Sequence, residues 1–440
     1  MRILRDSLAI CATIAAVGFA LAQRGVVQDG PDRLEQVSTL RDAIDAAGNR
    51  PLHILEIHGI GSEGAGDSLP LQDALCSRLH DCDQKAATKT REWADQGLFD
   101  PATVPAYEYM GTPIWTTQQE WLASAPFVDH YVIPRAGGKK LIVDEINWWP
   151  IAFPIKCRNV IAPEARLAGL LSEYEGDCTR PTQLDTDGKH FAQFAWIAAP
   201  AQNKMRAASI NRQLKNGIVD WNFSDAMLAA GGLHDLFVEA VRELMTNCAR
   251  FNADGTKSDN WSEDKDQVFL FVTHSLGSYL ALSTLDLGQE AGAGEVASTQ
   301  YIFQHAPLLY FFANQIPLLE LANAAAPPAA AKIMGETAVS SSKLKRQVSK
   351  WAQLRQQHQP KALPVSGCPT KPQIVAWSDP SDLLTYRVPA LDDALVVNAY
   401  VQNAPHWFGL FENPTTAHAN YVKNRHVLDV IMAHGACSRP

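Results

Sequence analysis

Several features that mark common protein classes are missing from this 440-residue sequence. No basic run of useful length occurs, and the formal net charge is -9, which argues against nucleic acid and anionic membrane surfaces as main partners. No Cys-x-x-Cys pair is present to suggest a zinc or redox site. The acid-rich stretch 252–266 lacks the ligand spacing of an EF-hand calcium loop, so we interpret it as a solvated connection. Hydrophobic residues make up 46% of the chain, which is enough for a large buried core.

Long apolar runs are also absent beyond the N-terminus, so no later segment is predicted to span a bilayer. Residues 1–22 have the pattern of a secretory signal peptide. Arg2 and Arg5 form a charged start, residues 8–20 form an apolar centre, and residues 20–22 form a small-residue cleavage site. We expect cleavage after residue 22 and a secreted or periplasmic protein. An uncleaved N-terminal anchor is the alternative.

Cysteine is scarce, with 8 residues, and Cys11 lies in the expected signal peptide. In an oxidising compartment the remaining cysteines could form disulfides. The pairs suggested by their positions are Cys76 with Cys82, Cys157 with Cys178, and Cys368 with Cys437. This pairing would leave Cys248 free, although sequence alone does not determine the connectivity.

The stretch 267–287 contains the strongest chemical signal in the chain. Residues 268–272 form a short, continuous apolar run that predicts a strand buried on both faces of a parallel sheet. The sequence Thr-His-Ser-Leu-Gly follows at 273–277, and apolar residues then recur at helical spacing through Leu285. A strand, a tight turn and a helix together form the context in which a serine becomes a nucleophile, so Ser275 is the candidate.

This arrangement resembles the nucleophile elbow of the α/β-hydrolase family, whose motif is G-x-S-x-G. Thr273 stands where the family has its first glycine. The resemblance implies an α/β-hydrolase fold, with a mainly parallel sheet flanked by helices and with large insertions. It also implies a lipase-like or esterase-like serine hydrolase.

A glycine-rich loop precedes this turn in the chain. Residues 52–57 predict a strand, and His-Gly-Ile-Gly follows at 58–61. The loop looks like the oxyanion loop of the same family, which would make the backbone N–H groups of Ile60 and Leu276 the oxyanion-hole donors. The alternative is an ordinary turn after a strand.

The acid and the base of the predicted triad follow later strands. Residues 373–377 predict a strand, and two aspartates come after it, of which we favour Asp382 as the acid over Asp379. We favour His418 as the base, because it lies just before the last helix, and His406 is the alternative. The resulting chain order of serine, acid and histidine is that of the family. We interpret His274, within the turn, as structural.

The remaining segments carry expectations about organisation. We predict one domain over 23–440 with insertions at about 80–135, 150–200 and 308–365. We expect strands at 141–146 and 301–303 and helices at 205–214 and 233–249. Residues 308–321 could be a lid, an acyl-binding wall or a buried helix, and residues 340–359 predict an exposed polar helix. The tryptophans scattered before the elbow are expected to be core residues rather than ligand contacts.

The sequence therefore predicts a secreted or periplasmic serine hydrolase that cleaves a carboxylic ester through Ser275, His418 and Asp382. The expected partner is a small-molecule or lipid ester, with transient contact with a membrane or lipid, and no metal or organic cofactor is implied. A thioesterase or an acyltransferase on the same fold would use the same groups. An inactive binding protein built on the scaffold is the other alternative.

Overall fold

The computed structural model describes residues 26–30, 32–59, 66–94, 108–109, 112–115, 121, 124–156, 223–258, 267–286, 293–321, 342–357, 370–405, 414–433 and 435. The predicted signal peptide, the helix expected at 205–214 and four of the cysteines expected in disulfides, Cys157, Cys178, Cys368 and Cys437, lie outside these residues. Within them, no helix has both the length and the apolarity needed to cross a membrane.

A nine-stranded sheet organises the described part of the chain, in the spatial order β1-β11-β10-β9-β8-β2-β7-β6-β3. The strands are β1 (Val27–Asp29), β2 (Leu52–Ile57), β3 (Thr88–Trp93), β6 (Phe127–Pro134), β7 (Lys140–Asn147), β8 (Val268–His274), β9 (Leu308–Phe312), β10 (Gln373–Ser378) and β11 (Leu395–Tyr400). The strands from β7 to β11 in this order are all parallel, while β1, β6 and β3 pair antiparallel at the two edges. A separate short pair consists of β4 (Glu108–Tyr109) and β5 (Thr112–Pro113).

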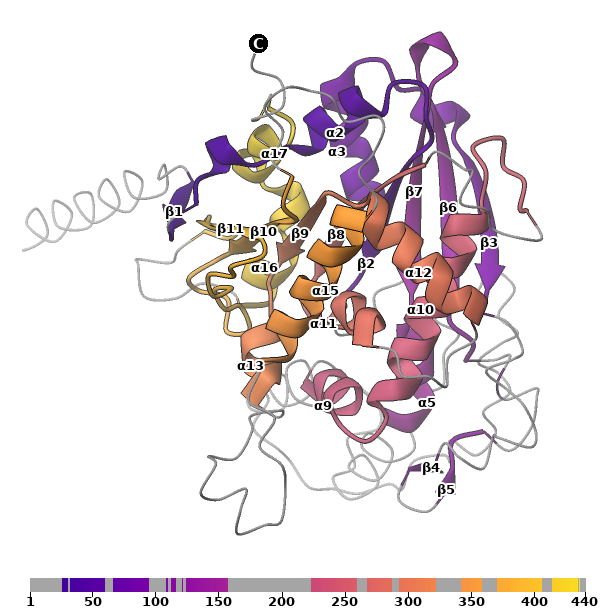
Figure 1. The fold of residues 1–440 in the computed structure, drawn as a ribbon, viewed down its shortest axis with the longest axis vertical. Coiled ribbons are helices and arrows are strands. Elements are labelled where there is room, and N and C mark those ends of the chain that lie inside the picture. The colour runs from indigo at the N-terminus through magenta and orange to yellow at the C-terminus, as the bar shows by residue number, and fades with distance from the viewer. Residues whose placement is uncertain are drawn as a thin grey trace, which may run out of the picture.

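Helices cover both faces of the sheet, so the chain has an α/β fold with a mostly parallel sheet (Figure 1). One layer contains α10 (His234–Arg250), α11 (Leu276–Ser283), α12 (Ala293–His305) and α15 (Lys343–Gln357), with α5 (Ala152–Lys156) and α9 (Ser224–Ala230) beside it. The other layer contains α2 (Leu40–Ala47), α3 (Leu69–Leu79) and α17 (Arg425–Ile431). Strand β8 shows why both layers are needed, because Phe271 packs into the first and Val272 into the second. A strand buried on both faces reads as the continuous apolar run seen in the sequence.

The expected strand at 301–303 is wrong, since these residues lie in α12. Tyr301, Ile302 and Phe303 are all buried in one core cluster, which also contains Trp351 of α15. A helix segment buried all round shows the same short apolar run as a strand, and periodicity could not separate the two.

Residues 308–321 are neither a lid nor a single helix. They form β9, hydrogen-bonded between β8 and β10, followed by the short α13 (Ile316–Glu320). All five β9 residues are buried, which explains the strong apolarity of the segment.

The helix expected at 340–359 exists as α15, but it is not an exposed insertion. Leu344, Val348 and Trp351 line a buried face in the core cluster that contains α11 and α12. Two segments expected as insertions, 80–135 and 308–365, thus supply strands β3, β6 and β9 to the main sheet. Most of the third, residues 157–200, lies outside the described residues.

Candidate active site

Ser275 sits in a tight turn between β8 and α11, at the carboxyl end of a central strand. Its backbone has φ 53° and ψ -120°, an unusual conformation for a residue with a side chain. The serine is fully buried, and its N–H donates to the carbonyl of Phe312 at the end of β9, at 2.7 Å. A strained backbone held by its surroundings is typical of functional turns. Here it places a hydroxyl at the start of a helix.

Two glycines allow other backbone segments to press against this turn. A Cβ atom on Gly277 would lie 2.2 Å from the carbonyl oxygen of Ile57 at the end of β2. A Cβ atom on Gly59 would lie 2.6 Å from the Cβ atom of Ser275. Both distances are too short for any side chain to fit without a shift of the backbone. The loop after β2 therefore packs directly on the candidate nucleophile.

Thr273 stands where the resemblance calls for glycine, and the structure shows how it fits. Its hydroxyl donates to the carbonyl of Tyr310 at 3.0 Å and lies 2.8 Å from the hydroxyl of Ser278. The side chain is fully buried, so both interactions satisfy a group that would otherwise lose its water contacts. The threonine thus ties β8 to β9 and to the first turn of α11.

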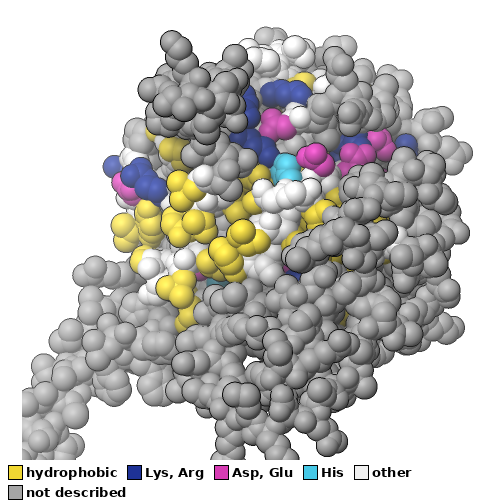
Figure 2. All heavy atoms as spheres, turned by 90° about the horizontal axis from the view of Figure 1, so that it is seen from below, with side chains coloured by type: hydrophobic (Ala, Val, Ile, Leu, Met, Phe, Trp, Pro, Cys, Tyr) yellow, Lys and Arg dark blue, Asp and Glu magenta, His cyan; other side chains and the backbone are white. Residues whose placement is uncertain are grey.

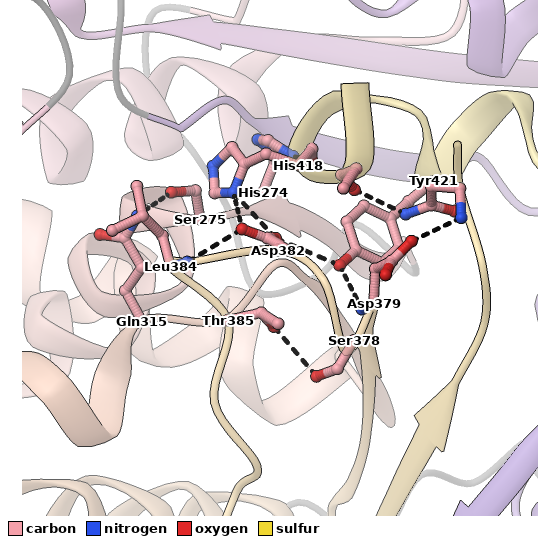
Figure 3. A network of polar contacts seen from close by, with 12 residues as sticks. His274, Ser275, Gln315, Ser378, Asp379, Asp382, Leu384, Thr385, His418 and Tyr421 are labelled. Atoms are coloured by element: carbon pink, nitrogen blue, oxygen red, sulfur yellow. Dashed lines mark hydrogen bonds and ion pairs between the residues drawn. The ribbon is translucent and has the colours of Figure 1, made fainter. Parts of the chain in front are cut away.

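Asp382 and His418 form a close pair next to this turn. Nδ1 of His418 lies 2.9 Å from both carboxylate oxygens of Asp382. The Asp382 side chain is 1% exposed, and the His418 side chain is 14% exposed. Figure 3 shows the His418 ring between the carboxylate of Asp382 and the hydroxyl of Ser275. Nε2 of His418 is buried and has no hydrogen-bond partner among the described residues.

Asp379, the other candidate acid, has a different set of contacts. Its Oδ1 accepts from the N–H of Ser381 at 2.8 Å, and its Oδ2 accepts from the N–H of Asn403 at 2.5 Å. It therefore joins the loop after β10 to the segment after β11, where the side chain of Asn403 donates to the carbonyl of Ala417 in α16 (Pro414–Ala419), the short helix that carries His418. Of the two aspartates, the one that meets a described histidine is Asp382. The rival base His406 lies outside the described residues.

Tyr421 and His274 hold the acid and the base in place. The hydroxyl of Tyr421 donates to Oδ2 of Asp382 at 3.3 Å and accepts from the N–H of Asp379 at 2.7 Å. Burial, and then the charge of Asp382, raise the pKa of Tyr421 well above its ordinary value, so the phenol keeps its proton and can donate. Nε2 of His274 lies 2.6 Å from the carbonyl oxygen of His418. This contact supports the structural interpretation of His274.

The structure describes one of the two predicted oxyanion donors, Leu276, and not the other, Ile60. Leu276 is the first residue of α11, so its N–H has no carbonyl one turn earlier within the helix. Ile60 lies outside the described residues. The chain on either side of it is fixed, because Gly59 contacts Ser275 and the carboxylate of Glu145 accepts from the N–H groups of Gly66 and Ser68 at 2.7 and 3.0 Å.

Gln315 is a residue of this site that sequence reasoning missed. It is 1% exposed, and its Nε2 donates to Oγ of Ser275 at 2.5 Å (Figure 3). It follows β9, the strand next to β8, by three residues. The available signal was a polar pair, Asn314 and Gln315, at the end of an apolar strand. This polar pair was overlooked because residues 308–321 were interpreted as one apolar segment.

Hydrophobic side chains gather on the face of the molecule seen from below in Figure 1 (Figure 2). Exposed apolar residues follow the carboxyl ends of β9 and β10: Leu321 is 70% exposed, Leu383 62% and Tyr386 38%. Leu383 is adjacent in sequence to Asp382. An apolar surface therefore adjoins the candidate active site, which suits a substrate with a hydrocarbon part.

A second histidine and aspartate cluster lies within the sheet, with residues that could hold a metal. His130, Asp144 and Cys248 offer ligand atoms within 4.8 Å of one another, all buried. The donors are already engaged, since Asp144 accepts from His130 at 2.6 Å and from His53 at 2.7 Å. Burial raises the pKa of the Cys248 thiol well above its ordinary value, which disfavours the thiolate needed for coordination. We assign the cluster to a charge network.

The expected disulfide between Cys76 and Cys82 is not formed in this structure, where both residues are free thiols. The two side chains are hydrogen-bonded to each other, and this contact is the largest cause of the raised pKa of Cys76 and of the lowered pKa of Cys82. Cys248, expected to be free, is a free buried thiol. Trp115 and Trp121 are fully buried and pack edge to face at 4.7 Å, in line with their predicted core role. The same prediction is wrong for Trp93, which is 40% exposed at the end of the edge strand β3.

Comparisons of the chain with protein-family models, with curated proteins and with solved structures give no match. Functional inference for this chain therefore depends on the geometry around Ser275.

Proposed function

We propose that this protein is a serine hydrolase with an α/β-hydrolase fold that cleaves carboxylic esters. The observation that carries the proposal is the pairing of His418 Nδ1 with Asp382 at 2.9 Å, beside a serine held at φ 53°. Ser275 and Asp382 follow the carboxyl ends of the parallel strands β8 and β10, and His418 lies in the short helix α16 (Pro414–Ala419), after β11. Ligand sites in open α/β sheets lie at this edge.

The contacts assign a role to each group. Asp382 accepts a hydrogen bond from Nδ1–H of His418 and so favours the tautomer in which Nε2 is unprotonated and able to take a proton. Oγ of Ser275 attacks the ester carbonyl carbon while its proton moves to Nε2, and a bond from Oγ to carbon forms. The N–H of Leu276, together with that of Ile60, would stabilise the oxyanion. The alcohol leaves with the proton from His418. Water then attacks the acyl carbon and gives a proton to Nε2 of His418, and Oγ of Ser275 leaves with that proton.

The substrate class follows from the surroundings of the triad. The serine is buried, and the apolar residues Leu321 and Leu383 are exposed after the neighbouring strands β9 and β10, which favours an uncharged ester with an apolar acyl group. We propose a small-molecule or lipid ester as the substrate, with transient contact with a membrane or lipid surface. The acidic net charge of -9 speaks against nucleic acid as a partner.

Secretion or a periplasmic location remains part of the proposal and depends on residues 1–22, which lie outside the described residues. N-terminal sequencing of the mature protein tests it directly. A start at Gln23 would support export with cleavage, whereas an intact Met1 would contradict it.

Hydrolysis of p-nitrophenyl butyrate by the purified protein tests the proposed reaction. We expect turnover that falls by several orders of magnitude in His418→Ala but stays within a few fold in His406→Ala. Parallel assays with a butyryl thioester show whether esters are preferred. A folded wild-type protein that hydrolyses none of these substrates would refute the proposal.

A further inference from the structure

We infer that Gln315 is a catalytic hydrogen-bond donor to Oγ of Ser275, and that it acts mainly when the acyl-enzyme breaks down. This inference rests on the proposed function. It concerns a side chain outside the triad and outside the two backbone donors of the oxyanion hole.

The structure holds the Gln315 backbone firmly. Its carbonyl accepts from the N–H groups of Leu318 and Leu319 at 3.0 and 3.1 Å, within the first turn of α13. The neighbouring Asn314 pairs with Tyr386 through both backbone and side chain, which joins the loop after β9 to the loop after β10. Ala313, just before, has φ 52° and bends the chain sharply at the strand end. The amide group is therefore preorganised toward the serine.

The hydrogen bond from Gln315 also limits the directions in which the O–H bond of Ser275 can point. Oγ accepts at 2.5 Å from Nε2 of Gln315, so the serine's own hydrogen must be directed elsewhere. Figure 3 shows the His418 ring on the side of Ser275 away from Gln315, and Nε2 of His418 has no hydrogen-bond partner among the described residues. The amide donor thus favours the hydroxyl orientation needed for proton transfer.

The hydrogen bond between Gln315 and Oγ of Ser275 changes in strength along the reaction. In the acyl-enzyme Oγ is an ester oxygen, which is a weak acceptor. During deacylation water adds to the acyl carbon and loses a proton to Nε2 of His418. The bond from carbon to Oγ then breaks, and Oγ takes that proton back. Negative charge grows on Oγ as this bond breaks, so the donor is worth more in the transition state than in the acyl-enzyme.

The test measures acylation and deacylation separately by stopped flow with p-nitrophenyl butyrate. Gln315→Met removes the donor at nearly constant size, and Gln315→Glu keeps the shape while replacing the donor with an acceptor. In Gln315→Met we expect the deacylation rate constant to fall about 10²-fold and the acylation rate constant less than tenfold. The amplitude of the p-nitrophenolate burst should then approach one molecule per molecule of enzyme, because the acyl-enzyme accumulates before it is hydrolysed. In Gln315→Glu we expect both rate constants to fall, because the carboxylate would also accept the serine hydrogen that acylation transfers to His418.

Gln373 provides a matched control at the opposite end of the sheet. It is 1% exposed, and its Nε2 donates to the hydroxyl of Ser38 at 3.1 Å, so Gln373→Met removes the same kind of bond. We expect both rate constants of this variant to stay within about twofold of wild type. Equal losses in acylation and deacylation for Gln315→Met, or no loss in either Gln315 variant, would overturn the inference.

Labelling of the wild type with a fluorophosphonate separates this inference from the proposed function. If Ser275 is labelled and the ester is hydrolysed, the hydrolase proposal stands whatever the Gln315 variants do. If the folded wild type is neither labelled nor active, the proposed function fails and the role of Gln315 fails with it.

Discussion

Asp382 and Asp144 each bind Nδ1 of a histidine at hydrogen-bond distance, but the two pairs have different surroundings. The pair of Asp382 and His418, which we call the loop pair, follows strands β10 and β11. Asp382 lies in a loop, and His418 lies in the short helix α16, with 14% of its side chain exposed. The pair of Asp144 and His130, which we call the strand pair, lies within strands β7 and β6, and both side chains are fully buried. Asp144 also binds His53, so both of its oxygens are occupied by histidines.

The other ring nitrogen shows what separates a candidate site from a structural network. Neither Nε2 atom has a hydrogen-bond partner among the described residues. Nε2 of His130 faces Glu92 at 3.9 Å, a carboxylate that is paired with Lys257 at 2.9 Å. The ring of His418, in contrast, lies beside the hydroxyl of Ser275 (Figure 3). An aspartate and histidine pair is therefore not a site by itself. It becomes one where the second nitrogen is left for a reacting group.

Removal of the nucleophile beside the loop pair has the largest expected effect on activity. Ser275→Ala should lower kcat for p-nitrophenyl butyrate roughly 10⁵-fold, because His418 then has no hydroxyl to deprotonate. The unfolding free energy, measured in urea, should change by less than about 1 kcal/mol, since only one atom is removed. Activity retained at a tenth of wild type would show that another group attacks the ester.

Neutralising the acid of the loop pair comes next. Asp382→Asn should lower kcat roughly 10³- to 10⁴-fold, because the amide no longer stabilises the protonated imidazole. Asp379→Asn is the control, and its loss of activity should be much smaller, since this residue supports loops without contacting His418. A larger loss in Asp379→Asn than in Asp382→Asn would reverse the assignment of the acid.

Replacing the aspartate of the strand pair by asparagine should lower the stability of the folded protein and leave its catalytic activity nearly unchanged. Asp144→Asn leaves two buried histidines without their carboxylate, which should cost about 3 to 5 kcal/mol of unfolding free energy. The kcat of the folded fraction should remain within a few fold of wild type. A selective loss of kcat without loss of stability would mean that the strand cluster takes part in the reaction.

The strand pair also predicts a pH dependence of stability. Burial disfavours charge on His130, but the hydrogen bond to Asp144 and the negative charges of Asp144 and Glu92 outweigh it and raise the pKa of His130 from 6.5 to about 9. A raised pKa stabilises the folded state fully below pH 6.5, and this stabilisation is lost as pH rises through 9. The loss is on the order of 3 kcal/mol at 1.4 kcal/mol for each pKa unit.

Urea unfolding of wild type and His130→Gln between pH 6 and pH 9.5 measures that loss. The stability difference between the two proteins should shrink as pH rises. A difference that is constant with pH would show that His130 is uncharged in the folded protein.

The smallest effect concerns the turn beside the loop pair, which is held by neutral hydrogen bonds rather than by charge. Thr273→Val removes the hydroxyl that contacts Tyr310 and Ser278, and should lower the unfolding free energy by about 1 to 2 kcal/mol. Thr273→Ser keeps the hydroxyl and should lose less. A larger loss in Thr273→Ser than in Thr273→Val would show that the methyl group, rather than the hydroxyl, stabilises the turn.

The sequence predicted most of the central sheet because its strands carry strong local signals. The continuous apolar run at 268–272 and the residues at 52–57 and 373–377 lie in β8, β2 and β10. The prediction for 301–303 failed because three successive buried apolar residues in a helix look like a short buried strand. Strand β9 was missed because its apolar run continues into the short helix α13, so the whole segment had no clear period.

The candidate site was predictable only in part, for a related reason. Ser275, Asp382 and His418 each follow a recognisable strand or precede a helix, so their positions carried information. Gln315 becomes relevant only through the contact of its amide with Ser275, across 40 residues of chain. No local pattern encodes that contact, and it required the packing of β9 against β8.

The most direct test of the central claim is labelling of the purified protein with a fluorophosphonate, followed by mass mapping of the modified peptide. We predict a single modification at Ser275 that is absent in Ser275→Ala, strongly slowed in His418→Ala and unchanged in Asp144→Asn. Absence of labelling in the folded wild type, or labelling that persists in Ser275→Ala, would contradict the assignment of Ser275 as an activated nucleophile.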